Sequence, residues 1–124
     1  MACLAAAIAL CTSLTAGQGA IVNGNTIITD DGAYIRLAEL NAPEKNSRGA
    51  CDAERMLAEY ATLALAKLLA NGFRVQIVGF DKGGYILAHL HLPDGRTASQ
   101  AQINAGLGVP YMGRIHDWCL RNKL

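Results

Sequence analysis

The stretch AIVNGNTIITDDGAYIRLAELNAPE, from Ala20 to Glu44, contains the strongest fold signals in the chain. Its short runs of β-branched and apolar residues are separated by two groups of turn residues, Asn23-Gly24 and Asp30-Asp31-Gly32. This pattern predicts a folded β-meander, in which consecutive strands lie side by side. The predicted strands cover residues 19–22, 25–29 and 33–40.

The third predicted strand alternates between apolar and polar residues. Ile35 and Leu37 fall on one face of the strand, whereas Tyr34 and Arg36 fall on the other. Pro43 then ends strand pairing, because a residue that precedes proline is restricted to extended or turn conformations. The stretch thus ends by directing polar side chains toward one place.

The rest of the sequence predicts two helices and two further strands. Apolar residues at helical spacing predict a long helix over Ala53–Ala70, with Asp52 as its N-cap and Gly72 as a left-handed residue at its end. Glycine-containing turns bound the later elements. These are strands over Phe73–Phe80 and Tyr85–Leu92 and a short helix from Thr97 or Ala98 to Ala105, after which residues 107–124 are predicted to be irregular.

Five strands, a long helix between the third and the fourth, and a short C-terminal helix indicate an α+β fold that is mostly β. The strand count and the helix placement match a five-stranded OB-fold barrel. A β-hairpin protein with loosely packed helices is the alternative that the pattern leaves open. The 124 residues are enough for one domain with one modest core.

The charged residues nearly balance, since 11 Lys and Arg stand against 10 Asp and Glu and the net charge is +1. Bulk charge therefore does not indicate a nucleic-acid binder, and any anion site depends on the local placement of charges. No stretch of the sequence is long and apolar enough to indicate a membrane span.

Residues 1–20 differ from the rest of the chain, because they hold no charged side chain and contain a run of Ala, Leu and Ile. This composition predicts a secretory signal peptide, cleaved between Ala16 and Ala20, followed by a domain over residues 21–124. The expected location is then secreted or periplasmic, with no stable membrane association after the signal is removed. A start that truncates a longer signal, and a buried N-terminal helix, are the alternatives.

Cysteine usage agrees with export. Cys3 and Cys11 lie in the predicted signal, which leaves Cys51 and Cys119 as an even pair in a small exported domain. A disulfide between them closes a long loop, which is worth about 4 kcal/mol in the chain-entropy model. Two free, separately buried thiols are the alternative, and the wide spacing argues against a zinc site.

The order of motifs along the chain resembles the staphylococcal nuclease (thermonuclease-like) family over residues 18–119. In that family a D-G-D-T turn, a strand ending in R-L, a D-x-P-E turn, a long helix, a D-x-x-G-R turn, a D-G turn and a helix ending in G-L-A follow one another. Each motif alone is weak, whereas all of them in the right order at compatible spacing are specific. The corresponding residues here are Asn23-Gly24-Asn25-Thr26, Arg36-Leu37, Asn41-Ala42-Pro43-Glu44, Ala53–Ala70, Asp81-Lys82-Gly83-Gly84-Tyr85, Asp94-Gly95 and Gly106-Leu107-Gly108.

The resemblance implies a secreted, Ca²⁺-dependent phosphodiesterase that cuts DNA or RNA on an OB barrel. In the family, two aspartates and a backbone carbonyl hold Ca²⁺, one arginine grips the phosphate, a glutamate activates water, and a second arginine stabilises the transition state. The metal ligands that this resemblance implies are Asn25, Asn41 and the carbonyl of Ala42.

The implied catalytic residues are Arg36, Glu44 and Tyr85, of which Tyr85 stands in place of the second arginine. Arg36 and Tyr85 are also implied to bind the substrate. Tyr111 joins them, because it lies just after the Gly-Leu motif, where the family offers aromatic contacts to a nucleotide.

Three of the implied side chains have changed type. Asn25 and Asn41 keep one neutral oxygen in place of each carboxylate, and Ca²⁺ affinity depends on the number of charged ligands. A missing metal cannot polarise the phosphate or lower the pKa of the attacking water. Tyr85 brings no positive charge, and losing one preorganised donor lowers a rate by roughly 10²–10³.

We therefore interpret the chain as a nuclease-like domain related to Ca²⁺-dependent phosphodiester hydrolysis, whose catalysis is impaired or lost. Calcium is the cofactor that the family implies, held weakly or not at all here. The alternative is a non-catalytic OB module that binds a phosphate-bearing ligand, a nucleic acid or a protein. Whether the chain is an enzyme stays open between these two hypotheses.

Each of these residues also has a simpler explanation. Asn suits turn positions on its own account, Arg36 can be a surface residue, and Glu44 can cap a loop. The two tyrosines can serve packing alone. His89 and His91 lie two apart on one strand face, but the sequence places no third ligand near them, which favours an ordinary strand face over a metal site.

Overall fold

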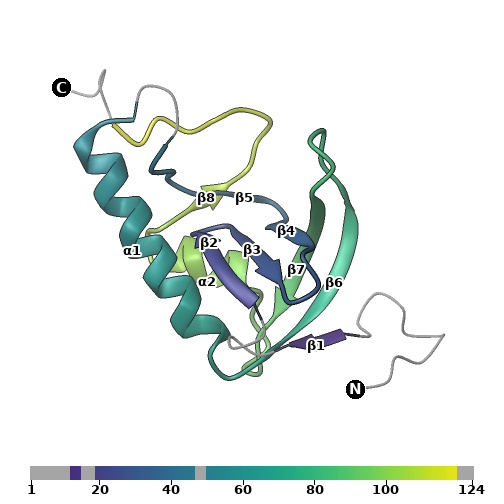
Figure 1. Ribbon diagram of the computed structural model, residues 1–124. Helices are drawn as coiled ribbons and strands as arrows, with labels where there is room; N and C mark the ends of the chain where they lie inside the picture. The colour runs from purple at the N-terminus through teal and green to yellow at the C-terminus, as the bar shows by residue number, and fades with distance from the viewer. Residues whose placement is uncertain (1–11, 15–18, 47–49, 120–124) are drawn as a thin grey trace.

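The computed structural model describes residues 12–14, 19–46 and 50–119. It shows a mixed α+β fold, in which a six-stranded sheet packs against two helices and a separate two-stranded sheet lies above it in the view of Figure 1. The elements in chain order are β1 (Thr12–Leu14), β2 (Gly19–Asn23), β3 (Thr26–Thr29), β4 (Tyr34–Leu37), β5 (Leu40–Asn41), α1 (Asp52–Leu69), β6 (Phe73–Phe80), β7 (Ile86–His91), α2 (Ala98–Asn104) and β8 (Val109–Pro110).

The strands of the large sheet follow the order β1-β6-β7-β4-β3-β2. Neighbouring strands are antiparallel except β4 and β7, which run parallel with Ile35 opposite Ile86. Two predicted turns, at 30–32 and 81–84, form the hairpin connections of β3 with β4 and of β6 with β7. The predicted β-meander is therefore confirmed over β2, β3 and β4.

The sheet does not close into a barrel within the described residues. Closure of the five strands β2, β3, β4, β7 and β6 requires the edge strands of this group, β2 and β6, to pair. In the structure β1 occupies the outer edge of β6 instead, with Leu14 opposite Phe73 and Thr12 opposite Val75. The α+β class is thus confirmed, and the OB barrel is not. The predicted signal peptide covers residues 1–20, most of which lie outside the described residues, so its cleavage stays a prediction.

The third strand of the meander is shorter than predicted. β4 ends at Leu37, and the backbone turns at Glu39, which has a left-handed φ of 61°. The chain then forms β5, which pairs with β8 in a region that was predicted to be irregular. Ser99 holds this turn, because its hydroxyl donates a buried 2.8 Å hydrogen bond to the carbonyl of Ala38. The local pattern does not reveal the turn, since this contact comes from 61 residues away.

The long helix is confirmed to within one residue at each end, since α1 spans Asp52–Leu69. Its N-cap is Cys51 rather than Asp52, because Cys51 has extended backbone angles and Asp52 is already helical. The Asp52 carboxylate instead pairs with Arg55 at 3.0 Å. Gly72 has a φ of 94°, which confirms the left-handed residue after the helix. Neither helix in the described part of the chain has the length and apolarity to cross a membrane.

The hydrophobic core lies between the sheet and the two helices. Leu37 of β4, Leu65 of α1 and Leu90 of β7 are at most 1% exposed. The predicted alternation along β4 is confirmed, because Ile35 and Leu37 are buried whereas Tyr34 is exposed. The remaining core residues are Ile27, Leu40, Ala42, Leu69, Phe73, Val75, Ala88, Leu92, Ala98 and Ala101.

A buried amide joins both helices to the turn between β2 and β3. Gln102 on α2 is fully buried, and its Nε2 donates hydrogen bonds to the carbonyl of Gly24, at 3.0 Å, and to that of Ala61 on α1, at 2.9 Å. The helix α1 also contacts the turn directly, since a Cβ atom added to Gly24 would lie 2.4 Å from the Ala61 Cβ. Glycine is therefore required at position 24 for this approach of helix and turn.

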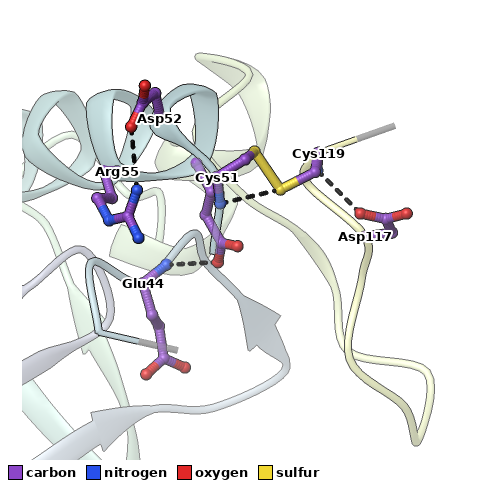
Figure 2. Close-up of a disulfide and its surroundings, with 7 residues drawn as sticks. Glu44, Cys51, Asp52, Arg55, Asp117 and Cys119 are labelled. Carbon is purple, nitrogen blue, oxygen red and sulfur yellow. Dashed lines mark hydrogen bonds and ion pairs between the residues drawn. A yellow bond between two sulfur atoms is a disulfide. The ribbon is translucent and has the colours of Figure 1, made fainter. Parts of the chain in front are cut away.

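Cys51 and Cys119 form the predicted disulfide (Figure 2). Their Cα atoms lie 5.9 Å apart, which is within the usual range for such a bridge. The bond ties the start of α1 to the end of the segment that follows β8, and the Cys51 amide donates to Cys119 Sγ at 3.2 Å. The alternative of two separate free thiols does not hold for this pair.

The close contact at Gly24 predicts a large cost for one added methyl group. We expect Gly24→Ala to lower the free energy of unfolding by about 1–3 kcal/mol, because Ala61 on α1 must move to make room. The matched control is Gly79→Ala in β6, where an added Cβ meets nothing within 4 Å. Urea denaturation measures both variants, and equal stabilities for the two would show that helix and turn are not in the contact described.

The disulfide predicts a stability that depends on oxidation. Replacing both Cys51 and Cys119 with Ser should lower the free energy of unfolding by about 4 kcal/mol, because the unfolded chain regains the freedom of a long loop. Denaturation of the wild type with and without a reductant gives an independent measurement. Unfolding midpoints that do not move on reduction would contradict the bridge.

Candidate functional site

A cleft of about 260 Å³ opens between the turn before β3, the strands β4 and β5, and the segment after β8. The structure brings five of the predicted site residues to this one cleft. They are Asn25, Arg36, Asn41, Glu44 and Tyr111. The other lining residues are Leu37, Glu39, Leu40, Asp81, Leu87 and Ile115.

Asn25 reaches the cleft from the turn that α1 and α2 hold in place. It is 6% exposed, and its Oδ1 accepts a hydrogen bond from the Thr26 hydroxyl at 3.0 Å. Its own backbone amide donates to Asn23 Oδ1 at 2.9 Å, a bond typical of turns. Turn chemistry therefore accounts for Asn23, whereas the side chain of Asn25 lies at the cleft.

Asn41 reaches the cleft from β5, beyond the left-handed turn at Glu39. It is 7% exposed and pairs with Val109 of β8. Its Nδ2 donates to the carbonyl of Arg114 at 3.3 Å. The side chain thus connects the cleft to the segment after β8, which also contributes Tyr111 to the lining.

The donor set at these positions does not fit a tightly held Ca²⁺. Asn25 and Asn41 are neutral amides that already take part in hydrogen bonds, and Ala42 is 2% exposed. Calcium sites in proteins gain their affinity from carboxylate ligands. Within the described ranges, no group of three or more His, Cys, Asp or Glu side chains is placed to hold a metal ion.

Arg36 is held by an acid and an aromatic ring. Its Nη1 lies 3.3 Å from Asp81 Oδ2, and its Cζ lies 4.4 Å from the centre of the Tyr85 ring. Its Nε is buried without a hydrogen-bond partner among the described residues. The guanidinium is therefore fixed in direction at the cleft, and an anion that binds it competes with the Asp81 carboxylate.

Asp81 is a functional neighbour that sequence reasoning treated only as part of a turn. Its Oδ1 accepts from the amides of Gly83 and Tyr85, both at 2.9 Å, while its Oδ2 faces Arg36. The first role was visible in the sequence, because Asp and Gly favour such turns. The second was not, since Arg36 lies 45 residues earlier and only the pairing of β4 with β7 brings the two together.

Tyr85 does not line the cleft. Its ring contacts the Arg36 guanidinium and stacks with the Tyr34 ring, with a distance of 5.4 Å between ring centres and an angle of 21°. Tyr111 does line the cleft and is 53% exposed. The two predicted tyrosines thus differ: Tyr111 faces the cleft, and Tyr85 supports Arg36.

Glu44 lines the cleft just beyond Pro43. Its backbone amide donates to Glu54 Oε2 at 3.0 Å, and its side chain points away from the disulfide (Figure 2). Glu54 is only 8% exposed in the first turn of α1, where the helix dipole stabilises a carboxylate. Sequence reasoning missed Glu54, although its place near the helix start was a usable signal.

His89 and His91 lie on β7, and neither lines the cleft. A ring nitrogen of His91 lies 2.7 Å from Gln76 Oε1, and His89 Nε2 lies 3.9 Å from Glu39 Oε1. Burial lowers the pKa of His91, and the nearby positive charge of Arg74 and the His89 ring lower it further. These contacts agree with a strand face rather than with a metal site.

Comparison with protein-family models and with curated proteins finds no match to this chain. The resemblance to staphylococcal nucleases therefore stays a prediction from the ordered motifs.

The lowered pKa of His91 predicts a loss of stability in mild acid. The unfolded chain binds a proton at this residue more readily than the folded domain, so stability is present above about pH 6.5 and falls as the pH drops through the folded pKa. His91→Gln should flatten this part of the stability profile. Urea denaturation from pH 8 to pH 5 measures it, and parallel profiles for the two proteins would contradict the expectation.

Proposed function

We propose that this chain is a staphylococcal nuclease-like domain whose cleft binds a phosphate-bearing ligand, foremost a nucleic acid, with little or no hydrolysis. One observation carries the proposal. Asn25, Arg36, Asn41 and Glu44, which the motifs identified separately, line the same cleft. Three motifs contribute these positions, and the turn before β3, β4 and the segment that begins at β5 bring them to one cleft, as a nuclease-like site requires.

The strand arrangement supports the fold part of this proposal. The five strands β2, β3, β4, β6 and β7, with α1 between β4 and β6, have the strand count and the helix placement of an OB fold, which is a partly open Greek-key barrel. The short β5–β8 pair and the β1–β6 pair are additions to that arrangement. We infer that β2 and β6 are the strands between which such a barrel is open.

Anion binding in the cleft depends on Arg36, because the lining also holds the carboxylates of Glu39, Glu44 and Asp81. Arg36 brings a positive charge, and the amides of Asn25 and Asn41 bring N–H donors where carboxylates would repel a phosphate. Charge-assisted hydrogen bonds from an arginine to phosphate oxygens are strong even where few other charges surround them. The same substitutions that weaken a calcium site therefore make the cleft more suitable for a phosphate group.

Hydrolysis lacks two of its parts here. A phosphodiesterase of the implied kind needs an ion beside the scissile phosphate and a second positive group for the developing charge. The neutral donors at Asn25 and Asn41 do not fit that ion, and Tyr85 carries no charge and lies behind Arg36. Glu44 keeps its place in the cleft, which is the observation that favours residual activity as the second hypothesis.

Export is part of the same proposal. A disulfide across the domain is stable in an oxidising compartment, such as the periplasm or the extracellular space. The uncharged segment 1–20 agrees with a secretory signal, and we infer that the mature domain is secreted or periplasmic.

A nuclease assay distinguishes the two hypotheses. The purified protein is incubated with single-stranded DNA and with RNA, in the presence of Ca²⁺ or other divalent ions and against an EDTA control. We expect no EDTA-sensitive cleavage above that of the Arg36→Ala variant. Clear EDTA-sensitive cleavage that Arg36→Ala abolishes would overturn the loss of hydrolysis and leave an active nuclease.

The triple variant Asn25→Asp, Asn41→Asp and Tyr85→Arg tests the assignment of the site. It should gain Ca²⁺ binding, measured by calorimetry, together with some cleavage of single-stranded DNA, because it restores both carboxylates and the second positive charge. A variant that folds but gains neither property would show that these positions are not those of the nuclease site.

Phosphate binding itself depends on the balance between Arg36 and Asp81. Titration with inorganic phosphate, followed by NMR shifts of amides around the cleft, should show binding that Arg36→Gln abolishes. Asp81→Asn keeps an oxygen for the turn but removes the competing charge, so we expect it to strengthen phosphate binding several-fold. Equal affinities for Asp81→Asn and the wild type would show that Asp81 does not compete for Arg36.

A further inference from the structure

We propose that Tyr34, stacked on Tyr85, is a platform for a nucleobase, and that the ligand of the cleft is a single-stranded oligonucleotide. We call these two residues the tyrosine platform. The inference rests on the proposed function, since it identifies the chemical class of the phosphate-bearing ligand. It adds Tyr34, which none of the sequence motifs includes.

Strand pairing fixes the tyrosine platform next to Arg36. β4 and β7 run parallel with Ile35 opposite Ile86, so the residues just before these, Tyr34 and Tyr85, lie side by side on the outer face. Their rings are stacked, with centres 5.4 Å apart at an angle of 21°. Arg36 follows Tyr34 by two residues on the same face of β4, and its Cζ lies 4.4 Å from the Tyr85 ring centre.

These three side chains form a row that leads from the cleft to solvent. Arg36 lines the cleft, Tyr85 contacts both of its neighbours in the row, and Tyr34 is 43% exposed at the far end. The residue that anchors β4 in the core is Ile35, which is 3% exposed, so packing does not require an aromatic ring at position 34. An exposed ring on a rigid support presents a flat surface for stacking at little cost in conformational entropy.

The order of the three side chains in the row indicates a ligand of more than one nucleotide. Tyr85 stands between Arg36 and Tyr34, so a base that stacks on Tyr34 and a phosphate that binds Arg36 belong to different nucleotides of one chain. Bases reach an aromatic surface only when they are unstacked from a partner strand, which selects single-stranded DNA or RNA.

Cross-strand packing is the competing explanation of the tyrosine pair, because aromatic pairs also stabilise sheets. Stacking on a nucleobase and packing within the sheet predict different effects of a substitution at position 34. A purely structural ring affects stability and every ligand alike. A stacking ring affects only those ligands that carry a base.

The experiment measures fluorescence anisotropy at low salt, with EDTA present to prevent cleavage. The probes are a labelled thymidine hexamer and a matched hexamer whose bases are all removed. We expect Tyr34→Ala to weaken binding of the thymidine hexamer roughly 5- to 100-fold, the range typical of lost base–aromatic stacking, and to leave the abasic hexamer within about twofold. Tyr34→Phe keeps the ring and should bind both probes like the wild type.

The control variant is Tyr60→Ala, which removes a ring of similar exposure, 54%, from α1, a helix that contributes no residue to the row. It should bind both hexamers like the wild type. An equal loss for both probes in Tyr34→Ala, or no loss for either, would overturn the platform and leave a structural pair.

Binding of inorganic phosphate distinguishes a failure of the tyrosine platform from a failure of the proposed anion site. If the wild type binds phosphate through Arg36 but binds both hexamers equally, the platform is wrong while the proposed anion site stands. If the wild type binds neither inorganic phosphate nor the abasic hexamer, the proposed function itself is wrong, and the oligonucleotide assignment falls with it.

Discussion

The domain depends on the buried side-chain amide of Gln102. This one group satisfies the carbonyls of Ala61 on α1 and Gly24 in the turn between β2 and β3. A buried carbonyl that loses such a partner costs about 1–3 kcal/mol, so both helices and the turn are coupled through it. Because Asn25 follows Gly24 directly, the contact that closes the core also positions one wall of the cleft.

Local signals in the sequence were sufficient for most elements, and contacts between distant residues were the main source of errors. Turn residues and alternation identified the meander, and helical spacing identified α1 to within one residue. The predicted end of β4 was wrong, because Ser99, which lies on α2, stabilises the turn at Glu39. The position of β1 on the edge of β6 was equally invisible, since neither strand carries a signal for its partner.

The sequence predicted which residues line the cleft but not how their charges interact. The motifs identified Arg36, Asn25 and Asn41 as site residues, and in the structure all three line the cleft. They did not show that Asp81 shares the arginine or that Tyr85 lies against it rather than in the cleft. The resulting site combines two side-chain amides and a single restrained guanidinium with the carboxylates of Glu39, Glu44 and Asp81. Such a site suits recognition of an anion, where orientation matters, more than the stabilisation of a growing charge in a transition state.

The disulfide between Cys51 and Cys119 makes one wall of the cleft depend on the redox state of these two cysteines. The segment that it anchors carries Tyr111 and Ile115 into the lining and accepts the bond from Asn41. In a reducing compartment this wall keeps that side-chain bond, the bond from the Tyr111 amide to the Glu39 carbonyl and the short β5–β8 pairing. Formation of the disulfide is therefore coupled to the arrangement of this wall of the cleft.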